Sequence, residues 1–242
     1  MSEHGEGSGV SIKRLLEAGV HLGHSRRYWN PKTRDFVFTM RNQLHIIDLR
    51  KTIKHLDAAC DAVRGMVSYD QEILFVGTKR NIAEIVESNA RRAGMPFVNR
   101  RWLGGMLTNH RTIKLRVERL KAIEYEFEHR GTAHLSKKER LKLEAEHQRL
   151  ENNVGGVKNM NGLPRALFVV DVANERIAVA EANKIRIPVF AVVDTNSDPS
   201  RIDYPIPGND DSQRSVKLLV EALADACIAG AAEKPAGVVQ AS

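Results

Sequence analysis

Arginines and aromatic rings occur together in a short segment near the N-terminus, a combination suited to contacts with RNA. The segment contains Arg26, Arg27, Tyr28 and Trp29, followed by Lys32. Guanidinium groups bridge phosphate oxygens and stack on bases, and tyrosine and tryptophan rings stack on unpaired bases. These five residues are candidates for RNA binding. The alternatives are that Trp29 packs the loop onto the body and that the arginines are ordinary solvated surface.

A second segment repeats this chemistry near the middle of the chain. Arg100 and Arg101 precede Trp102, which has the same packing alternative as Trp29. Polar and basic residues continue the group: Asn109, His110, Arg111, Lys114 and Arg116. Charged residues on an exposed helix also form ordinary intrahelical salt pairs. The segment is therefore a further candidate for contacts with RNA phosphates.

The turn formed by residues 77–80, Gly-Thr-Lys-Arg, follows an apolar run and precedes a helical pattern. Open α/β sheets bind phosphate at such positions, because free backbone N–H groups and the helix dipole favour an anion. Three interpretations stay open: Lys79 and Arg80 contact RNA phosphate, a flavodoxin-like enzyme binds a nucleotide there, or the turn is ordinary. The Walker pattern and the GxGxxG pattern of nucleotide sites are both absent.

Aspartates are dense where the last predicted strand ends and after it: Asp194, Asp198, Asp203, Asp210 and Asp211. Carboxylates there could hold Mg²⁺ or act as acid and base, with His21 and His24 as additional members. Aspartate also forms turns and caps helices, which is the alternative interpretation. We expect no catalytic residues and no cofactor, apart from a possible structural Mg²⁺.

Charge is distributed unevenly along the chain. The 242 residues include 37 basic and 30 acidic ones, for a formal net charge of +7. Residues 100–160 hold fourteen Lys and Arg against eight Asp and Glu, whereas residues 161–242 hold eight against eleven. This polarity is typical of a protein that docks one face on a polyanion such as RNA.

The remaining composition is that of a cytoplasmic protein. The two cysteines, Cys60 and Cys227, are interpreted as buried free thiols, which fits a reducing compartment. The N-terminus lacks the apolar region of a secretory signal, and the longest apolar runs are too short to span a bilayer. We therefore expect no contact with a membrane.

Apolar strands alternate with helical patterns over most of the chain, which predicts an α/β fold with a mostly parallel sheet covered on both faces. Strands are predicted at 73–76, 97–98, 166–170 and 188–193. Helices are predicted at 52–69, 80–93 and 174–184, with a last helix capped by Asp210 or Asp211 and reaching Ala229. Near the N-terminus we expect a helix at 11–18 and short strands at 36–38 and 45–47, separated by a turn at 41–43.

An insertion interrupts this alternation at residues 103–160. Apolar residues recur at heptad spacings in two arms: Ile113, Val117, Leu120 and Phe127, then Leu143, Leu150 and Val154, with His147 as the irregular member. Gly131 can separate the arms, and Ser136 with Glu139 forms a capping-box signature. The insertion predicts a protruding coiled-coil helical hairpin. Residues 11–102 and 161–229 would form one domain, between a flexible arm at 1–10 and a disordered tail at 230–242.

Long sequence blocks in a fixed order resemble the family of bacterial small-subunit ribosomal protein two. The blocks are residues 18–24 (AGVHLGH), 27–32 (RYWNPK), 73–80 (ILFVGTKR), 101–109 (RWLGGMLTN), 192–199 (VVDTNSDP) and 206–211 (IPGNDD). The resemblance extends from about Ser11 to Ala229, nearly the whole chain. It implies a flavodoxin-like sheet with a protruding coiled-coil hairpin and no enzymatic activity.

The same resemblance implies the partners. The family binds the head and neck region of the 16S rRNA and helps to seat the large mRNA-binding protein one of the small subunit. We therefore expect a structural constituent of the ribosome, with no small-molecule substrate. The sequence departs from the family mainly at its ends, where the N-terminal arm is long and the tail is short.

Overall fold

Five parallel strands form the central sheet of the computed structural model, which describes residues 9–129 and 136–233. They are β4 (Ile73–Val76), β5 (Phe97–Val98), β6 (Ala166–Val170), β7 (Val189–Val193) and β8 (Tyr204–Pro207). Their order is β5-β4-β6-β7-β8, and every neighbouring pair is parallel. All residues of β4, β6 and β7 are buried, which explains their continuous apolar sequences.

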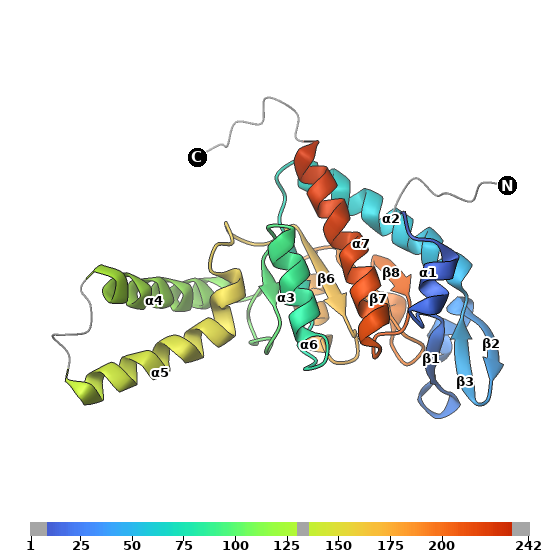
Figure 1. Cartoon of the computed structure of the whole chain (residues 1–242), viewed down its shortest axis with the longest axis horizontal. Helices are drawn as coiled ribbons and strands as arrows, with labels where there is room; N and C mark the ends of the chain where they lie inside the picture. The colour runs from blue at the N-terminus through green and yellow to red at the C-terminus, as the bar shows by residue number, and fades with distance from the viewer. Residues whose placement is uncertain (1–8, 130–135, 234–242) are drawn as a thin grey trace.

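Helices cover both faces of this sheet (Figure 1). One core lies beneath α2 (Leu49–Ser68), α3 (Ala83–Arg92) and α7 (Gln213–Ala232) and includes Phe75 and Phe168. The opposite core lies beneath α6 (Arg176–Lys184) and includes the alternate residues of the strands, such as Leu74 and Leu167. The α/β fold with a parallel sheet between helices, which the sequence predicted, is confirmed.

Two helices project away from the β5 side of the sheet in Figure 1: α4 (His110–His129) and α5 (Lys137–Val154). They pack through Ile113, Leu120, Ile123, Leu150 and Val154, which are buried and belong to the same core as α6. Arg119 and Glu146 join the helices by two hydrogen bonds of 2.9 and 2.8 Å. The predicted break at Gly131 lies outside the described residues.

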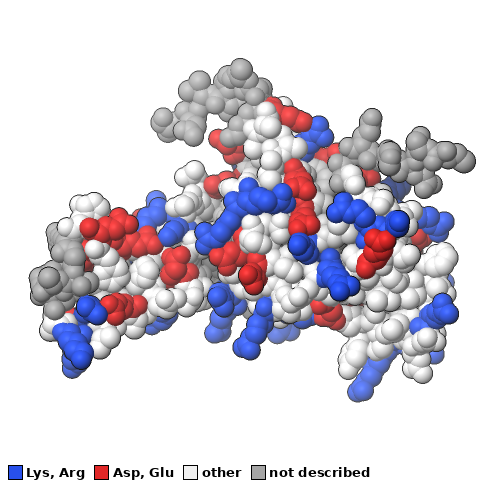
Figure 2. All heavy atoms as spheres, in the orientation of Figure 1, with Lys and Arg blue, Asp and Glu red and all other residues white. Residues whose placement is uncertain are grey.

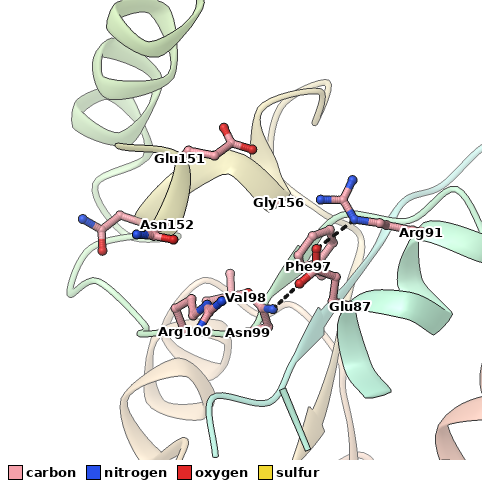
Figure 3. Close-up of a pocket in the computed structure, with 10 residues that line it drawn as sticks. Glu87, Arg91, Phe97, Val98, Asn99, Arg100, Glu151, Asn152 and Gly156 are labelled. Carbon is pink, nitrogen blue, oxygen red and sulfur yellow. Dashed lines mark hydrogen bonds and ion pairs between the residues drawn. The ribbon is translucent and has the colours of Figure 1, made fainter. Parts of the chain in front are cut away.

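A one-turn helix, η3 (Gly155–Val157), returns the chain from α5 to the edge of the sheet. Figure 3 shows Gly156 beside Phe97 of β5. A Cβ atom at Gly156 would lie 2.2 Å from the Phe97 carbonyl oxygen, so the two backbones are in direct contact. Residues of α3, β5, α5 and η3 surround a small cavity of about 110 Å³ at this junction.

A separate three-stranded antiparallel sheet forms near the N-terminus. Its strands are β1 (Leu22–Ser25), β2 (Val37–Arg41) and β3 (Leu44–Ile47), in the order β1-β3-β2. Asn42 and Gln43 connect β2 to β3 with φ angles of 49° and 62°, as a tight hairpin requires. The helix α1 (Ile12–Glu17) precedes this sheet, and the short helices η1 (Arg26–Tyr28) and η2 (Pro31–Phe36) join β1 to β2.

Some predicted boundaries were wrong. The sequence placed β1 in a loop and did not predict β8. Helix α7 is preceded by Ser212 at its N-cap position, so neither Asp210 nor Asp211 caps it. It continues to Ala232 with Gly230 buried, because Gly230 packs against the Arg64 carbonyl of α2. The predicted tail therefore begins too early, and both 1–8 of the predicted arm and 234–242 of the tail lie outside the described residues.

Candidate nucleic-acid interface

The turn after β4 already holds an anion from its own chain. The backbone N–H of Thr78 donates to Glu175 Oε1 at 2.9 Å, and the Thr78 hydroxyl donates to the same oxygen at 2.5 Å. Lys79 forms ion pairs with Asp171, at 3.3 Å, and with Asp211. Arg80 is exposed. Thr78 and Lys79, which the sequence analysis considered for binding a phosphate, are therefore already bound to carboxylates of this chain.

Carboxylates gather around His24 at the carboxyl ends of the strands. His24 Nδ1 lies 3.2 Å from Asp194 Oδ2, and His24 Nε2 lies 3.2 Å from Asp211 Oδ2. The hydrogen bond with Asp194 raises the pKa of His24 to about 9. Asp210 is 1% exposed, and burial together with Asp194 raises its pKa to about 8. Asp210 Oδ2 has no hydrogen-bond partner.

This cluster has the donor set of a metal site. One ligand atom each from His24, Asp194 and Asp210 lies within 4.8 Å of the others. An imidazole nitrogen with two carboxylate oxygens suits Zn²⁺, whereas Mg²⁺ favours oxygen ligands in octahedral geometry. His21, the other predicted member, is not part of this group, and burial lowers its pKa.

The two arginines and the tyrosine of the first segment are exposed. Arg26 and Arg27 are exposed on η1, and Tyr28 is 60% exposed with the Arg27 guanidinium 5.8 Å from its ring centre. Trp29 is half-buried and stacks on His45 at 5.1 Å between ring centres. Its predicted role in RNA contacts is untested, but the stacking supports the packing alternative.

Lys32 differs from the arginines because it already has anionic partners. Its Nζ donates to Asp198 Oδ2 at 2.7 Å and to Ser200 Oγ at 3.1 Å. The Lys32 hydrogen bond, followed by those from Ser200, lowers the pKa of Asp198 to about 2. Lys32 thus ties η2 to the loop after β7, and its charge is largely neutralised.

The second segment lies where the helical pair leaves the sheet. Arg100 and Arg101 are exposed, whereas Trp102 is buried in the core that α6 covers. The other predicted residues are exposed Asn109, half-buried His110, exposed Arg111 and exposed Lys114. Within the described ranges, no carboxylate pairs with Arg100, Arg101, Arg111 or Lys114. On the face of the molecule drawn in Figure 2, basic and acidic side chains are interspersed, so that face is not uniformly basic.

Comparison with known proteins decides the family. The model of the family "Ribosomal protein S2" matches residues 15–230. The chain belongs to the ribosomal protein S2 family. Three curated relatives carry the name "Small ribosomal subunit protein uS2". The relative from Thermobifida fusca is 50% identical over 91% of this chain and 76% of its own length. Those from Marinobacter nauticus and Hahella chejuensis are 47% and 50% identical, over 94% and 92% of this chain and 91% and 88% of their own lengths.

Family membership settles the broad function that the sequence predicted. This S2-family protein is a structural constituent of the small ribosomal subunit and not an enzyme. Its place is therefore the ribosome, which in bacteria is a cytoplasmic particle. None of the helices in the described ranges combines the length and apolar character of a membrane span.

One important residue of this S2-family protein was missed from the sequence. Glu181 of α6 is 8% exposed and accepts five hydrogen bonds from the segment 102–108. The donors are Trp102 Nε1, the backbone N–H groups of Gly105, Leu107 and Thr108, and the Thr108 hydroxyl. A carboxylate between the buried Ala178 and Ala182 was the available signal.

Proposed function

We propose that this protein binds small-subunit 16S rRNA through its exposed, unpaired arginines and the basic root of its hairpin. The observation that carries this proposal is a contrast between two groups of cations. Lys32 and Lys79 are bound to carboxylates, whereas Arg26, Arg27, Arg100 and Arg101 are exposed and have no carboxylate partner in the described part of the chain. Unpaired guanidinium groups keep their capacity to neutralise phosphates.

Contacts of this kind act mainly on the RNA backbone. Each neutralised phosphate releases condensed counterions, so affinity falls with salt by a log–log slope of about −0.7 to −0.9 per phosphate. Backbone contacts fix the position of the protein on folded RNA and carry little sequence information. Salt-insensitive binding would contradict this mechanism.

Reversing four arginines tests the interface. We expect the combined variant R26E, R27E, R100E and R101E to fold normally but to lose stoichiometric co-sedimentation with small subunits stripped of their own copy. The matched control carries the same charge change at four other exposed cations without described partners: Lys13, Lys54, Lys184 and Arg214. Equal loss in both variants would contradict the assigned surface. Melting of the first variant alone would make its arginines structural.

A different surface suits the protein partner that the resemblance implies. Strand β2 is an edge of the small sheet and exposes Phe38, at 64%, and Met40, at 47%. Arg50 lies 5.7 Å from the Phe38 ring centre. Exposed apolar side chains on an unpaired strand edge favour contact with another protein. We propose that protein one of the small subunit is seated here.

The substitution Phe38→Asp tests this seat. We expect it to weaken binding of purified protein one to reconstituted small subunits at least tenfold, because an aromatic anchor is lost and a charge is introduced. Subunit incorporation should be unchanged. Tyr69→Asp is the control, since Tyr69 is 66% exposed at the end of α2. Unchanged binding of protein one to the Phe38 variant would move the seat elsewhere.

We also propose that His24, Asp194 and Asp210 hold a divalent cation. The observation that favours it is the buried, unpartnered Asp210 Oδ2 facing a second buried carboxylate. Calorimetric titration of the isolated chain with Zn²⁺ and with Mg²⁺ should show one site that prefers Zn²⁺. A concentration 100 times the Kd should stabilise the fold by about 2.7 kcal/mol.

Asp210→Asn separates the cation from the fold. It should abolish the metal-dependent stabilisation. Above about pH 8, where Asp210 of the metal-free protein is ionised, it should also raise the Tm, because a buried negative charge is removed. Asp198→Asn, which alters a half-buried carboxylate outside this cluster, should keep the metal response. Equal metal binding by all three proteins would refute the site.

A further inference from the structure

A groove runs along the root of the helical pair, between α4 and the segment 157–162. Its volume is about 520 Å³, within the range of ordinary ligand sites. Its α4 wall consists of His110, Ile113, Lys114, Val117, Glu118 and Lys121. Its other wall consists of Val157, Lys158, Met160, Asn161 and Gly162. The two walls combine an apolar floor with a basic rim.

The floor of the groove is lined by apolar side chains, on which an aromatic ring can pack. Ile113 and Val157 are 4% and 3% exposed, and Val117 and Met160 are partly buried beside them. His110 begins α4 at one end of the groove, and its Nδ1 is buried without a hydrogen-bond partner. A histidine ring is among the side chains on which unpaired bases stack.

The rim supplies positive charge that the protein does not use itself. Lys114 and Lys121 are exposed, and neither has a carboxylate partner in the described ranges. They are two helical turns apart on the same face of α4, about 10 Å along the axis. Lys158, by contrast, is held by Glu124 at 2.8 Å. Glu118 is the carboxylate that lines the groove.

We propose that this groove binds an unstacked nucleotide of single-stranded RNA. The base lies on the apolar floor beside His110, and the flanking phosphates are neutralised by Lys114 and Lys121. Charge complementarity selects a polyanion, and the apolar floor selects a strand with free bases over a duplex whose bases are paired. The inference deepens the proposed rRNA binding, on which it rests, and gives the hairpin root a preference for unpaired segments.

The test compares an octauridylate and an octaadenylate with a short RNA duplex, using fluorescence anisotropy on the full chain. We expect the single strands to bind more tightly than the duplex. The variant K114E with K121E should reduce the salt slope for single strands by about 1.4, which is two phosphates at about 0.7 each. The variant K138E with K142E is the control on α5, where both lysines are exposed.

A second pair of variants tests the floor without changing charge. Val117→Trp should fill the groove and weaken single-strand binding about tenfold with an unchanged salt slope. Leu115→Trp is the control, because Leu115 is 59% exposed on the same helix and does not line the groove.

A further variant tests the charge of the groove. Glu118→Gln introduces no bulk and should strengthen binding by removing a negative charge. Equal effects of the two tryptophans, or no effect of Glu118→Gln, would overturn the proposal.

Other outcomes distinguish the groove from the wider interface. Displacement of the RNA by octaglutamate at equal concentration would show a general acidic-peptide site and overturn the proposal. Normal single-strand binding by the groove variants, with co-sedimentation still lost in the four-arginine variant, would refute the groove and leave the proposed function intact. Single-strand binding that depends on the groove, together with no co-sedimentation of the wild-type chain, would support the groove and refute the proposed function.

Discussion

Glu181→Ala should lower the free energy of unfolding by about 3 kcal/mol and loosen the root of the hairpin. The carboxylate accepts five hydrogen bonds from the segment 102–108, and its removal leaves buried donors, including Trp102 Nε1, without partners. Each buried unsatisfied donor costs about 1–3 kcal/mol. Urea unfolding measures the stability, and hydrogen exchange of residues 102–110 measures the loosening.

Glu181→Gln is the matched variant. The amide keeps one oxygen acceptor but replaces the other with an NH₂ group that faces donors. We expect a loss between wild type and Glu181→Ala. Hydrogen exchange that is unchanged in both variants would show that packing alone holds the segment, and would contradict the role assigned to this carboxylate.

The same residue predicts part of the acid sensitivity. Burial acts to raise the pKa of Glu181, but the N–H groups of Thr108 and Gly105 and the Trp102 indole outweigh it, and the pKa lies below its usual value of 4.5. A lowered folded-state pKa means that this stabilisation is complete above the unfolded-state pKa and is lost as pH falls through the folded-state pKa. The stability of Glu181→Ala should therefore decline less than wild type below about pH 4.5.

Gly156→Ala should be the most damaging single-methyl change at the junction between hairpin and sheet. Its Cβ would lie 2.2 Å from the Phe97 carbonyl oxygen and 2.8 Å from the ring. Figure 3 shows how closely η3 approaches β5 here. Backbone cannot rotate away as a side chain can, so we expect a loss of about 2–3 kcal/mol in thermal or urea unfolding.

Gly155→Ala is the control for this prediction. The atoms nearest to a Cβ at Gly155 would be those of the Glu151 carboxylate, at 2.6 to 2.8 Å, and this group is the far end of a flexible side chain. We expect its effect to lie within about 0.5 kcal/mol of zero. Similar losses in the two variants would mean that glycine flexibility, rather than the contact with Phe97, is required at this position.

Local patterns were sufficient to predict the sheet and most of its helices. Buried parallel strands are uniformly apolar, and amphipathic helices repeat every 3.6 residues, so both leave local signals. Strand β8 left no local signal, because prolines in its sequence Tyr-Pro-Ile-Pro argue against a strand. The structure accommodates them because β8 is an edge strand that pairs only with β7. Strand β1 was missed because Gly23, His24 and Ser25 do not form an apolar strand pattern. Its residues are selected by long-range contacts instead, since Gly23 lies against Thr195 and His24 contacts Asp194.

The candidate interface was predictable in residue type but not in pairing. Lys32 meets Asp198 across 166 positions of sequence, and Lys79 meets Asp211 across 132. Whether a lysine is free for RNA depends on such long-range neighbours, which follow from topology. Asp210 illustrates the same limit. As a helix cap it would be solvated, but in the structure it is buried in the loop between β8 and α7, close to Asp194 and His24.

Thr195 links the N-terminal part of the chain to a loop that is synthesised much later. Its carbonyl accepts hydrogen bonds from the Asn30 N–H at 2.8 Å and the Thr33 hydroxyl at 3.1 Å, and its own hydroxyl accepts one from the His24 N–H at 2.8 Å. The first fifth of the chain therefore docks on a loop that is synthesised about 160 residues later. During translation the N-terminal sheet and η2 lack these hydrogen bonds until residue 195 has been synthesised. A chain released before residue 195 would expose the same loops that we assign to RNA, and nascent-chain capture by RNA would then compete with folding.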